Sequence, residues 1–214
     1  MQSFLKLLLI QKTAFSIVVK YFLFTLIGSG ILFASGLIPP QSHGDWEVLQ
    51  EDGIWVGWTN YNESQWCRAK STLNAPMEKI SKIIEDKANY PNVFKRVESV
   101  TIITDEIVHI VLDMPFPFYG RDYIVSYTQH EENGDSIYLF QAVKNSGIPV
   151  HEDYVRLVHA AGEWRLRSLD DKNTEVTYSW NGELLGDFPD WALTRAWETQ
   201  GIEVLTWLKE AIKE

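Results

Sequence analysis

The feature that most constrains the fold is a run of short β-type segments followed by one long amphipathic helix. Six segments rich in β-branched and aromatic residues lie at residues 97–104, 107–114, 123–129, 136–144, 153–169 (with a break near Gly162) and 174–180. Turn residues such as Asn133-Gly134-Asp135 separate most of them, which is typical of hairpin connections. Hairpin-linked strands framed by helices predict an antiparallel α+β protein rather than a parallel α/β sheet.

The last predicted element, residues 190–213, has the residue spacing of an amphipathic helix. Its apolar stripe consists of Leu193, Trp197, Gly201, Val204, Leu205, Leu208 and Ile212. Its opposite side is predicted to carry Arg195, Glu198, Glu203, Lys209 and Glu210. We therefore expect a curved antiparallel sheet that wraps around a long C-terminal helix.

The region before residue 97 predicts shorter elements. A helical turn is expected over residues 45–50, and strands are expected over residues 54–59 and 66–73. An amphipathic helix should follow Pro76, because apolar residues then recur at helical spacing: Met77, Ile80, Ile83, Ile84 and Ala88.

Residues 1–44 predict a membrane or export segment, preceding a domain of residues 45–214. Residues 21–38 are uncharged and mostly apolar, and as an N-terminal hydrophobic helix they would extend about 27 Å. All the lysines of residues 1–44 come before this stretch, which favours a cytoplasmic N-terminus. Two interpretations stay open: a signal peptide cleaved near Ala34, or an uncut transmembrane anchor. Both place the domain outside the cytoplasm, either periplasmic or secreted, and the anchor would tether it to the membrane.

Charge and composition exclude several classes of function. The whole chain has a formal charge of −10, and residues 1–44 contribute three lysines and no acidic residue, so the remainder carries −13. A domain this acidic would repel phosphate backbones, which argues against nucleic-acid binding. Cys67 is the single cysteine, which excludes an internal disulfide, and the histidines show no metal-ligand spacing. No nucleophile or nucleotide-binding motif is present, so the sequence predicts no catalytic residue, no metal and no cofactor.

An ordered set of short motifs runs through the second half of the chain. In order they are Asp113-Met114-Pro115-Phe116-Pro117, Arg121-Asp122-Tyr123-Ile124-Val125, Gly147-Ile148-Pro149, Tyr154-Val155-Arg156 and Gly186-Asp187-Phe188-Pro189-Asp190-Trp191. In this order they resemble the START domain, the steroidogenic acute regulatory protein-related lipid transfer domain. The resemblance covers residues 45–214 and implies a helix-grip fold of the Bet v 1-like superfamily.

The resemblance implies a non-enzymatic protein that binds or transfers a lipid or another hydrophobic small molecule. The ligand would lie in a cavity between the sheet and the C-terminal helix. Arg121 and Asp122 match a pair that is expected to form a structural ion pair. Arg156 matches a position that is either a charge in the cavity wall or an outward cation. Phe188 and Trp191 match the loop at the cavity mouth, where we expect them to touch the membrane.

Strand alternation selects further ligand-binding candidates. Successive side chains point to opposite faces of a strand, and the face with the larger apolar residues should point inward. This places Tyr123 and Tyr127, Trp164, and Tyr178 and Trp180 on the cavity side. Trp197, on the last helix, completes the predicted set.

Two alternative functions stay open. Cyclases and dehydratases share this superfold, and His109, Tyr123, Tyr127 and Arg156 are the groups that would supply acid–base chemistry. An interaction scaffold is the other alternative, and it predicts a collapsed pocket filled with side chains.

Overall fold

A computed structural model describes residues 37–115, 118–143, 147–181, 184–185 and 189–213. A compact unit spans Ile38–Glu214 and contains its own hydrophobic core. The predicted N-terminal hydrophobic helix and its cleavage site lie outside the described residues. Among the helices that the structure does describe, none is long and apolar enough to cross a membrane.

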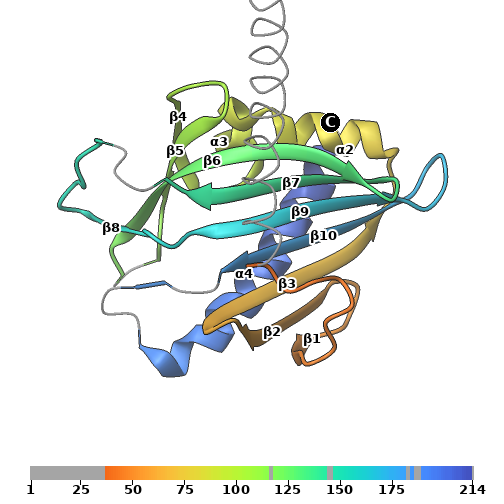
Figure 1. Cartoon of the computed structure of the whole chain (residues 1–214), viewed down its shortest axis with the longest axis horizontal. Coiled ribbons are helices and arrows are strands. Elements are labelled where there is room, and N and C mark those ends of the chain that lie inside the picture. The colour runs from red at the N-terminus through yellow and green to blue at the C-terminus, as the bar shows by residue number, and fades with distance from the viewer. Residues whose placement is uncertain (1–36, 116–117, 144–146, 182–183, 186–188, 214) are drawn as a thin grey trace, which may run out of the picture. The chain divides into compact units, whose positions relative to one another are not determined.

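The unit is an α+β fold built on one large curved sheet (Figure 1). Its strands are β1 (Glu47–Gln50), β2 (Trp55–Tyr61), β3 (Ser64–Leu73), β4 (Val97–Ile102), β5 (Ile107–Leu112), β6 (Gly120–Glu132), β7 (Asp135–Ala142), β8 (Tyr154–Arg156), β9 (Ala161–Ser168) and β10 (Thr174–Asn181). The order across the sheet is β1-β2-β3-β10-β9-β7-β6-β5-β4, and all these neighbours are antiparallel. Short β8 pairs in parallel with β6.

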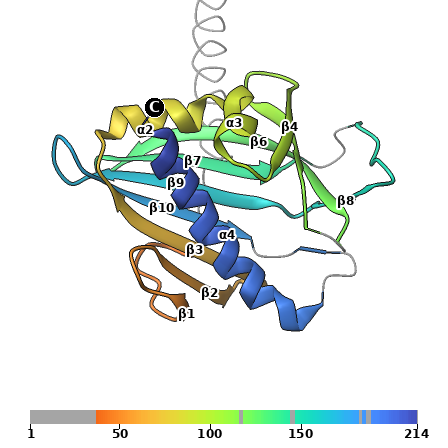
Figure 2. The ribbon, with the colours of Figure 1, turned by 180° about the vertical axis from the view of Figure 1, so that it is seen from behind.

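The helices lie mainly on one side of this sheet. They are α2 (Met77–Glu85), the 3-10 turn η1 (Lys87–Asn89), α3 (Tyr90–Val93) and the long α4 (Asp190–Ala211). Figure 2 shows α4 running diagonally across the face of the sheet, with α2 and α3 beyond one end of it. The predicted helix-grip architecture, a curved antiparallel sheet wrapped around the C-terminal helix, is therefore confirmed.

Helix α4 lies close against the sheet at Gly201. A β-carbon at this position would lie 2.9 Å from a methyl group of Val56 and 3.2 Å from the β-carbon of Ala69. Val56 and Ala69 are opposite each other on β2 and β3, and both are completely buried. The absence of a side chain at Gly201 thus lets the middle of the helix rest directly on this side of the sheet.

Two details of the predicted elements are wrong. Residues 47–50 form β1, not a helical turn, because they pair with β2 in an antiparallel ladder. The segment 153–169 contains two strands, but the interruption lies at residues 157–160 and β9 runs through Gly162.

Residues 38–43, which we call the strap, pack on the face of the sheet opposite α4. Arg68 alternates with Ala69 on β3, so its side chain points away from the helix, and it is completely buried. Its guanidinium donates hydrogen bonds to the carbonyls of Pro39 and Pro40 and to Ser179 Oγ, the last at 2.8 Å. Burial lowers the pKa of Arg68 to about 10, and nearby Glu163 opposes that shift.

The strap also contributes its own apolar surface and a second polar contact. Ile38 is 5% exposed, although it lies at the very start of the compact unit. Gln41 donates to Glu163 Oε1 at 3.2 Å, and Arg165 donates to the same oxygen at 3.1 Å. The strap therefore covers the buried Arg68 together with Trp46, whose ring centroid lies 4.6 Å from the guanidinium carbon.

We predict that a chain starting at residue 45 is less stable than one starting at residue 38. Loss of the strap removes the hydrogen bonds from Arg68 to the Pro39 and Pro40 carbonyls, and it exposes the apolar surface that Ile38 covers. Together these contacts contribute at least about 2 kcal/mol to the free energy of unfolding. For a domain of this size the melting temperature should fall by about 4–8 °C, measured by circular dichroism.

The Arg68→Met substitution in both chains provides the control, because the strap then has no guanidinium to bind. When both chains carry Arg68→Met, the difference between their melting temperatures should be smaller. Equal melting temperatures of the two unsubstituted chains would show that the strap does not stabilise the domain.

Candidate functional site

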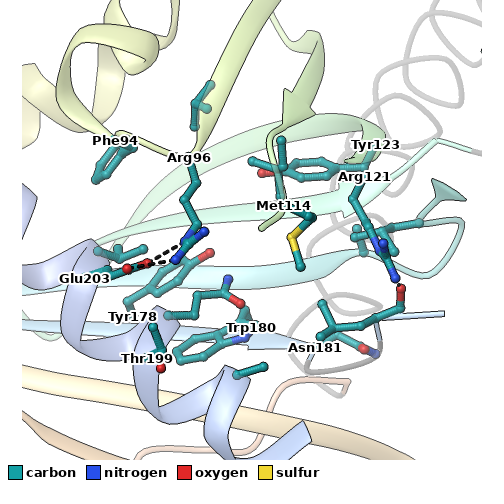
Figure 3. A pocket seen from close by; sticks show the side chains of 18 of the residues that line it. Phe94, Arg96, Met114, Arg121, Tyr123, Tyr178, Trp180, Asn181, Thr199 and Glu203 are labelled. Atoms are coloured by element: carbon teal, nitrogen blue, oxygen red, sulfur yellow. Dashed lines mark hydrogen bonds and ion pairs between the residues drawn. The ribbon is translucent and has the colours of Figure 1, made fainter. Parts of the chain in front are cut away.

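A cavity of about 320 Å³ lies between α4 and the part of the sheet formed by β4–β7, β9 and β10. This volume falls at the lower end of the range for ligand pockets, about 300–1,000 Å³. The lining is mostly apolar and aromatic, with a small number of polar groups (Figure 3). The interaction-scaffold alternative predicts a collapsed pocket, and the described residues instead enclose open space.

The cavity exists because α4 presents two different faces. One face is buried in the core through Trp197, Gly201, Leu205, Leu208 and Ile212. The neighbouring face lines the cavity through Ala192, Ala196, Thr199, Gln200, Glu203, Val204 and Trp207. The small side chains of the first turns of this second face leave room between the helix and the sheet.

The sheet contributes an aromatic wall. The ring centroid of Tyr178 lies 4.2 Å from that of Trp164 and 5.0 Å from that of Trp180. Phe140 extends the wall on one side. Its ring centroid lies 6.3 Å from that of Tyr178 and 5.7 Å from that of Tyr127. These rings are held by strand pairing and by each other, so the wall is rigid and preformed.

An ion pair joins the two sides of the cavity. The Arg96 guanidinium, just before β4, makes two hydrogen bonds to the Glu203 carboxylate of α4, at 2.5 and 2.9 Å (Figure 3). Both side chains are partly buried, and the hydrogen bonds to Glu203 raise the pKa of Arg96. The pair places no net formal charge in the wall and ties α4 to the edge strand.

Arg121 holds two loops together at the other side of the cavity. Its buried guanidinium donates hydrogen bonds to the carbonyls of Tyr119, Leu184 and Leu185, the last two at 3.1 and 3.0 Å. Tyr119 belongs to the β5–β6 connection, and the two leucines belong to the β10–α4 connection. Arg121 thus acts as a crosslink between backbone segments that border the cavity.

Asp122 is the centre of a buried polar cluster on the opposite face of the sheet. Arg156 on β8 donates to both of its carboxylate oxygens, at 2.7 and 2.6 Å, and His109 on β5 lies 2.8 Å from Oδ2. Burial alone would raise the pKa of Asp122, but the hydrogen bonds from Arg156 and His109 lower it below the ordinary value. Arg156 also donates to the carbonyls of Ile148 and Pro149, which fixes the loop before β8.

The predicted ion pair between Arg121 and Asp122 is therefore wrong. Adjacent residues on a strand point to opposite faces, so Arg121 faces the cavity while Asp122 faces outward. Asp122 pairs with Arg156 from another strand.

The structure brings together Tyr123, Tyr127, Trp164, Tyr178 and Trp180, all in the cavity lining. Arg156 does not line the cavity, because its side chain is bound to Asp122 on the other face. Trp197 also lies elsewhere: it is 2% exposed and packs on Trp58, 5.1 Å between centroids. Trp191 is 84% exposed at the start of α4, and Phe188 lies outside the described residues.

Several lining residues were not predicted from the sequence. Arg96 and Glu203 are separated by 107 positions, and neither stands in a motif. Helical periodicity assigned Glu203 to the polar side of the last helix, and the structure places it in the cavity wall. Met114 and Pro115 line the cavity and do belong to the Asp113–Pro117 motif, which could have identified them.

Comparison with known proteins places the chain in a family. The sequence profile of the START domain matches residues 43–214, so this chain belongs to the START domain family. An uncharacterised protein of Pseudomonas aeruginosa is 24% identical over 154 residues, which cover 69% of this chain and 76% of that protein.

Solved structures share the fold at low sequence identity. A STAR-related lipid transfer protein from Xanthomonas axonopodis superimposes with a TM-score of 0.70 at 21% identity, covering 80% of this chain and 100% of that one. Human StAR-related lipid transfer protein 5 gives a TM-score of 0.73 at 15% identity, covering 88% of this chain and 94% of that one.

We predict that Asp122→Asn strongly destabilises the protein at neutral pH. The substitution leaves the Arg156 cation, whose side chain is 13% exposed, without its buried carboxylate partner, and breaking a buried ion pair costs about 3–5 kcal/mol. Because the folded pKa of Asp122 is lowered, its stabilisation is complete above the ordinary aspartate pKa of about 3.9 and is lost as the pH falls through the folded pKa.

Urea denaturation between pH 7 and pH 3 measures both effects. The free energy of unfolding of Asp122→Asn should be lower at pH 7 and should fall less steeply on acidification than that of the unsubstituted protein. Asp153→Asn, whose side chain is 71% exposed, is the matched control and should change little. Equal effects of the two substitutions would contradict the central role of Asp122.

Proposed function

We propose that this protein binds one lipid or similar hydrophobic small molecule in the cavity between the sheet and α4, and carries it without covalent change. The observation that supports this most strongly is the preformed aromatic cavity in a chain of the START domain family. The names of the similar Xanthomonas and human proteins, both lipid transfer proteins, point the same way.

The driving force would be removal of apolar surface from water. Burial of apolar surface contributes about 25 cal/mol per Å², so a ligand that buries roughly 300 Å² gains about 7 kcal/mol before the cost of association. A rigid wall increases the net affinity, because few side chains have to be ordered on binding.

The positions of the titratable groups favour a carrier over an enzyme. Of the groups that would supply acid–base chemistry, His109 and Arg156 belong to the Asp122 cluster on the other face of the sheet. Tyr123 and Tyr127 do line the cavity, but burial raises the pKa of both phenols. A group that stays protonated far above neutral pH is a poor general base.

We also propose that the protein loads its ligand at a membrane surface, through the start of α4. Trp191 is 84% exposed, and the next residue, Ala192, lines the cavity. Tyr119 is 63% exposed and follows Phe118, which also lines the cavity. Exposed amphipathic rings beside a lipid-sized cavity suit the interface between water and lipid. Phe188 would join them by its place in the sequence.

We predict that Ala196→Phe abolishes ligand uptake without unfolding the domain. Ala196 lines the cavity from α4, so a phenyl ring there would fill the space that the ligand needs. Delipidated protein is titrated with Nile red, a fluorescent hydrophobe, and its melting temperature is recorded. Lys209→Phe places the same ring on the exposed side of α4 and should leave uptake unchanged. Undiminished uptake by Ala196→Phe would place the binding site elsewhere.

We predict that Trp191→Ala slows transfer of a fluorescent lipid between phosphatidylcholine vesicles severalfold and leaves its equilibrium uptake unchanged. The ring is proposed to act only while the protein touches the membrane. Leu169→Ala is the matched control: Leu169 is 52% exposed and lies by the β9–β10 turn, at the opposite end of the molecule from the start of α4 (Figure 1). Equal transfer rates for Trp191→Ala and the unsubstituted protein would refute the membrane contact.

A further inference from the structure

Four tyrosines line the cavity, and two of them, Tyr90 and Tyr127, interact with each other. The Tyr90 hydroxyl donates a hydrogen bond to the Ile84 carbonyl at 2.6 Å. Tyr90 therefore needs no ligand as its acceptor, and Tyr127 has the neighbouring Tyr90 phenol oxygen available to it.

The other two tyrosines, Tyr123 on β6 and Tyr178 on β10, differ in this respect. Within the described part of the chain, neither hydroxyl has a hydrogen-bond partner, although Tyr178 is only 9% exposed. Figure 3 shows both side chains reaching into the cavity from different strands. Neither hydroxyl is among the fully buried polar atoms without a partner, so both open onto the cavity, and a ligand that displaces water from them has to supply the hydrogen-bond partner.

These hydroxyls are neutral donors. Burial raises the pKa of Tyr123 and of Tyr178, and for Tyr178 the neighbouring phenols of Tyr123 and Tyr90 raise it further. The Trp180 indole stacks on Tyr178 and supplies only an N–H donor, which likewise has no partner among the described residues. This side of the cavity therefore offers hydrogen-bond donors and no charge.

The charged groups of the lining are placed differently. Arg96 is neutralised by Glu203, and Arg121 is bound to three backbone carbonyls. Arg195 lines the cavity from the exposed side of α4. A ligand anion would therefore be attracted to this exposed edge, whereas an uncharged oxygen can be buried against the tyrosines without a large desolvation cost.

We propose that Tyr123 and Tyr178 donate hydrogen bonds to an uncharged oxygen of the ligand, such as a ketone, an ester carbonyl or a hydroxyl. The preferred cargo is thus a neutral, oxygen-bearing lipid that binds with its polar end inside the cavity. This inference rests on the proposed ligand-binding function and specifies the class of ligand.

Three probes of similar size test the proposal: undecan-2-one as the neutral ketone, dodecane as the hydrocarbon, and undecanoate as the anion. Each is titrated against Nile red bound to residues 38–214, the compact unit that includes the strap. The affinities are compared between the unsubstituted protein and the double variant Tyr123→Phe/Tyr178→Phe, so that differences in probe hydration cancel.

The double variant should bind undecan-2-one about tenfold more weakly than the unsubstituted protein does, and its affinity for dodecane should be unchanged. Tyr138→Phe is the control, since its hydroxyl binds Glu85 at 2.8 Å and lies outside the cavity lining. If the double variant does not fold, each single variant should lose about threefold for the ketone alone.

Equal losses for ketone and dodecane would overturn the proposal, because the rings would then act only by packing. A loss confined to undecanoate would overturn it in favour of an anionic ligand. If Nile red itself does not bind the unsubstituted protein, the proposed ligand-binding function fails and this inference fails with it.

Discussion

The contact between α4 and the sheet at Gly201 is the constraint on which the cavity depends. Because the helix rests directly on Val56 and Ala69, its axis is fixed close to β2 and β3. The sheet curves, so the same straight helix stands away from β5–β7 and β9, and Ala192 and Ala196 do not fill the space that results. The cavity is thus produced by tight packing on one side of the helix and small side chains on the other.

Buried charge is concentrated on the face of the sheet away from the cavity. There Arg68 holds the strap, and Asp122 joins β5, β6 and β8 through His109 and Arg156. Buried arginine and aspartate need several partners, and backbone carbonyls and neighbouring strands supply them. The cavity wall is mostly aromatic and apolar, and its buried charges are the Arg96–Glu203 pair and Arg121, which binds three backbone carbonyls.

Much of the fold follows from patterns that a single chain displays. Strand alternation identified Tyr123, Tyr127, Trp164, Tyr178 and Trp180, because large apolar residues on one face of a strand point to the interior. Helical spacing identified α4 and its buried stripe. The ordered motifs identified the family, which the profile match over residues 43–214 confirms.

The remaining features depend on contacts between distant residues. Glu203 looks like a solvent-facing residue in the helix pattern, and only the position of Arg96 explains why it lines a cavity. Trp197 is a large aromatic residue of the kind that often contacts a ligand. Because α4 lies close against the sheet at Gly201, the Trp197 side chain instead packs on Trp58 in the core. Residues 47–50 form a strand because their backbone pairs with the free edge of β2.

The central claim is that the cavity holds one hydrophobic molecule, and native mass spectrometry tests it most directly. Residues 38–214 are purified without detergent from a lipid-containing host, weighed intact and then extracted for identification of any bound compound. The account predicts one discrete added mass of lipid size at about one copy per chain. A protein that carries no added mass, and acquires none after incubation with lipid vesicles, would contradict it.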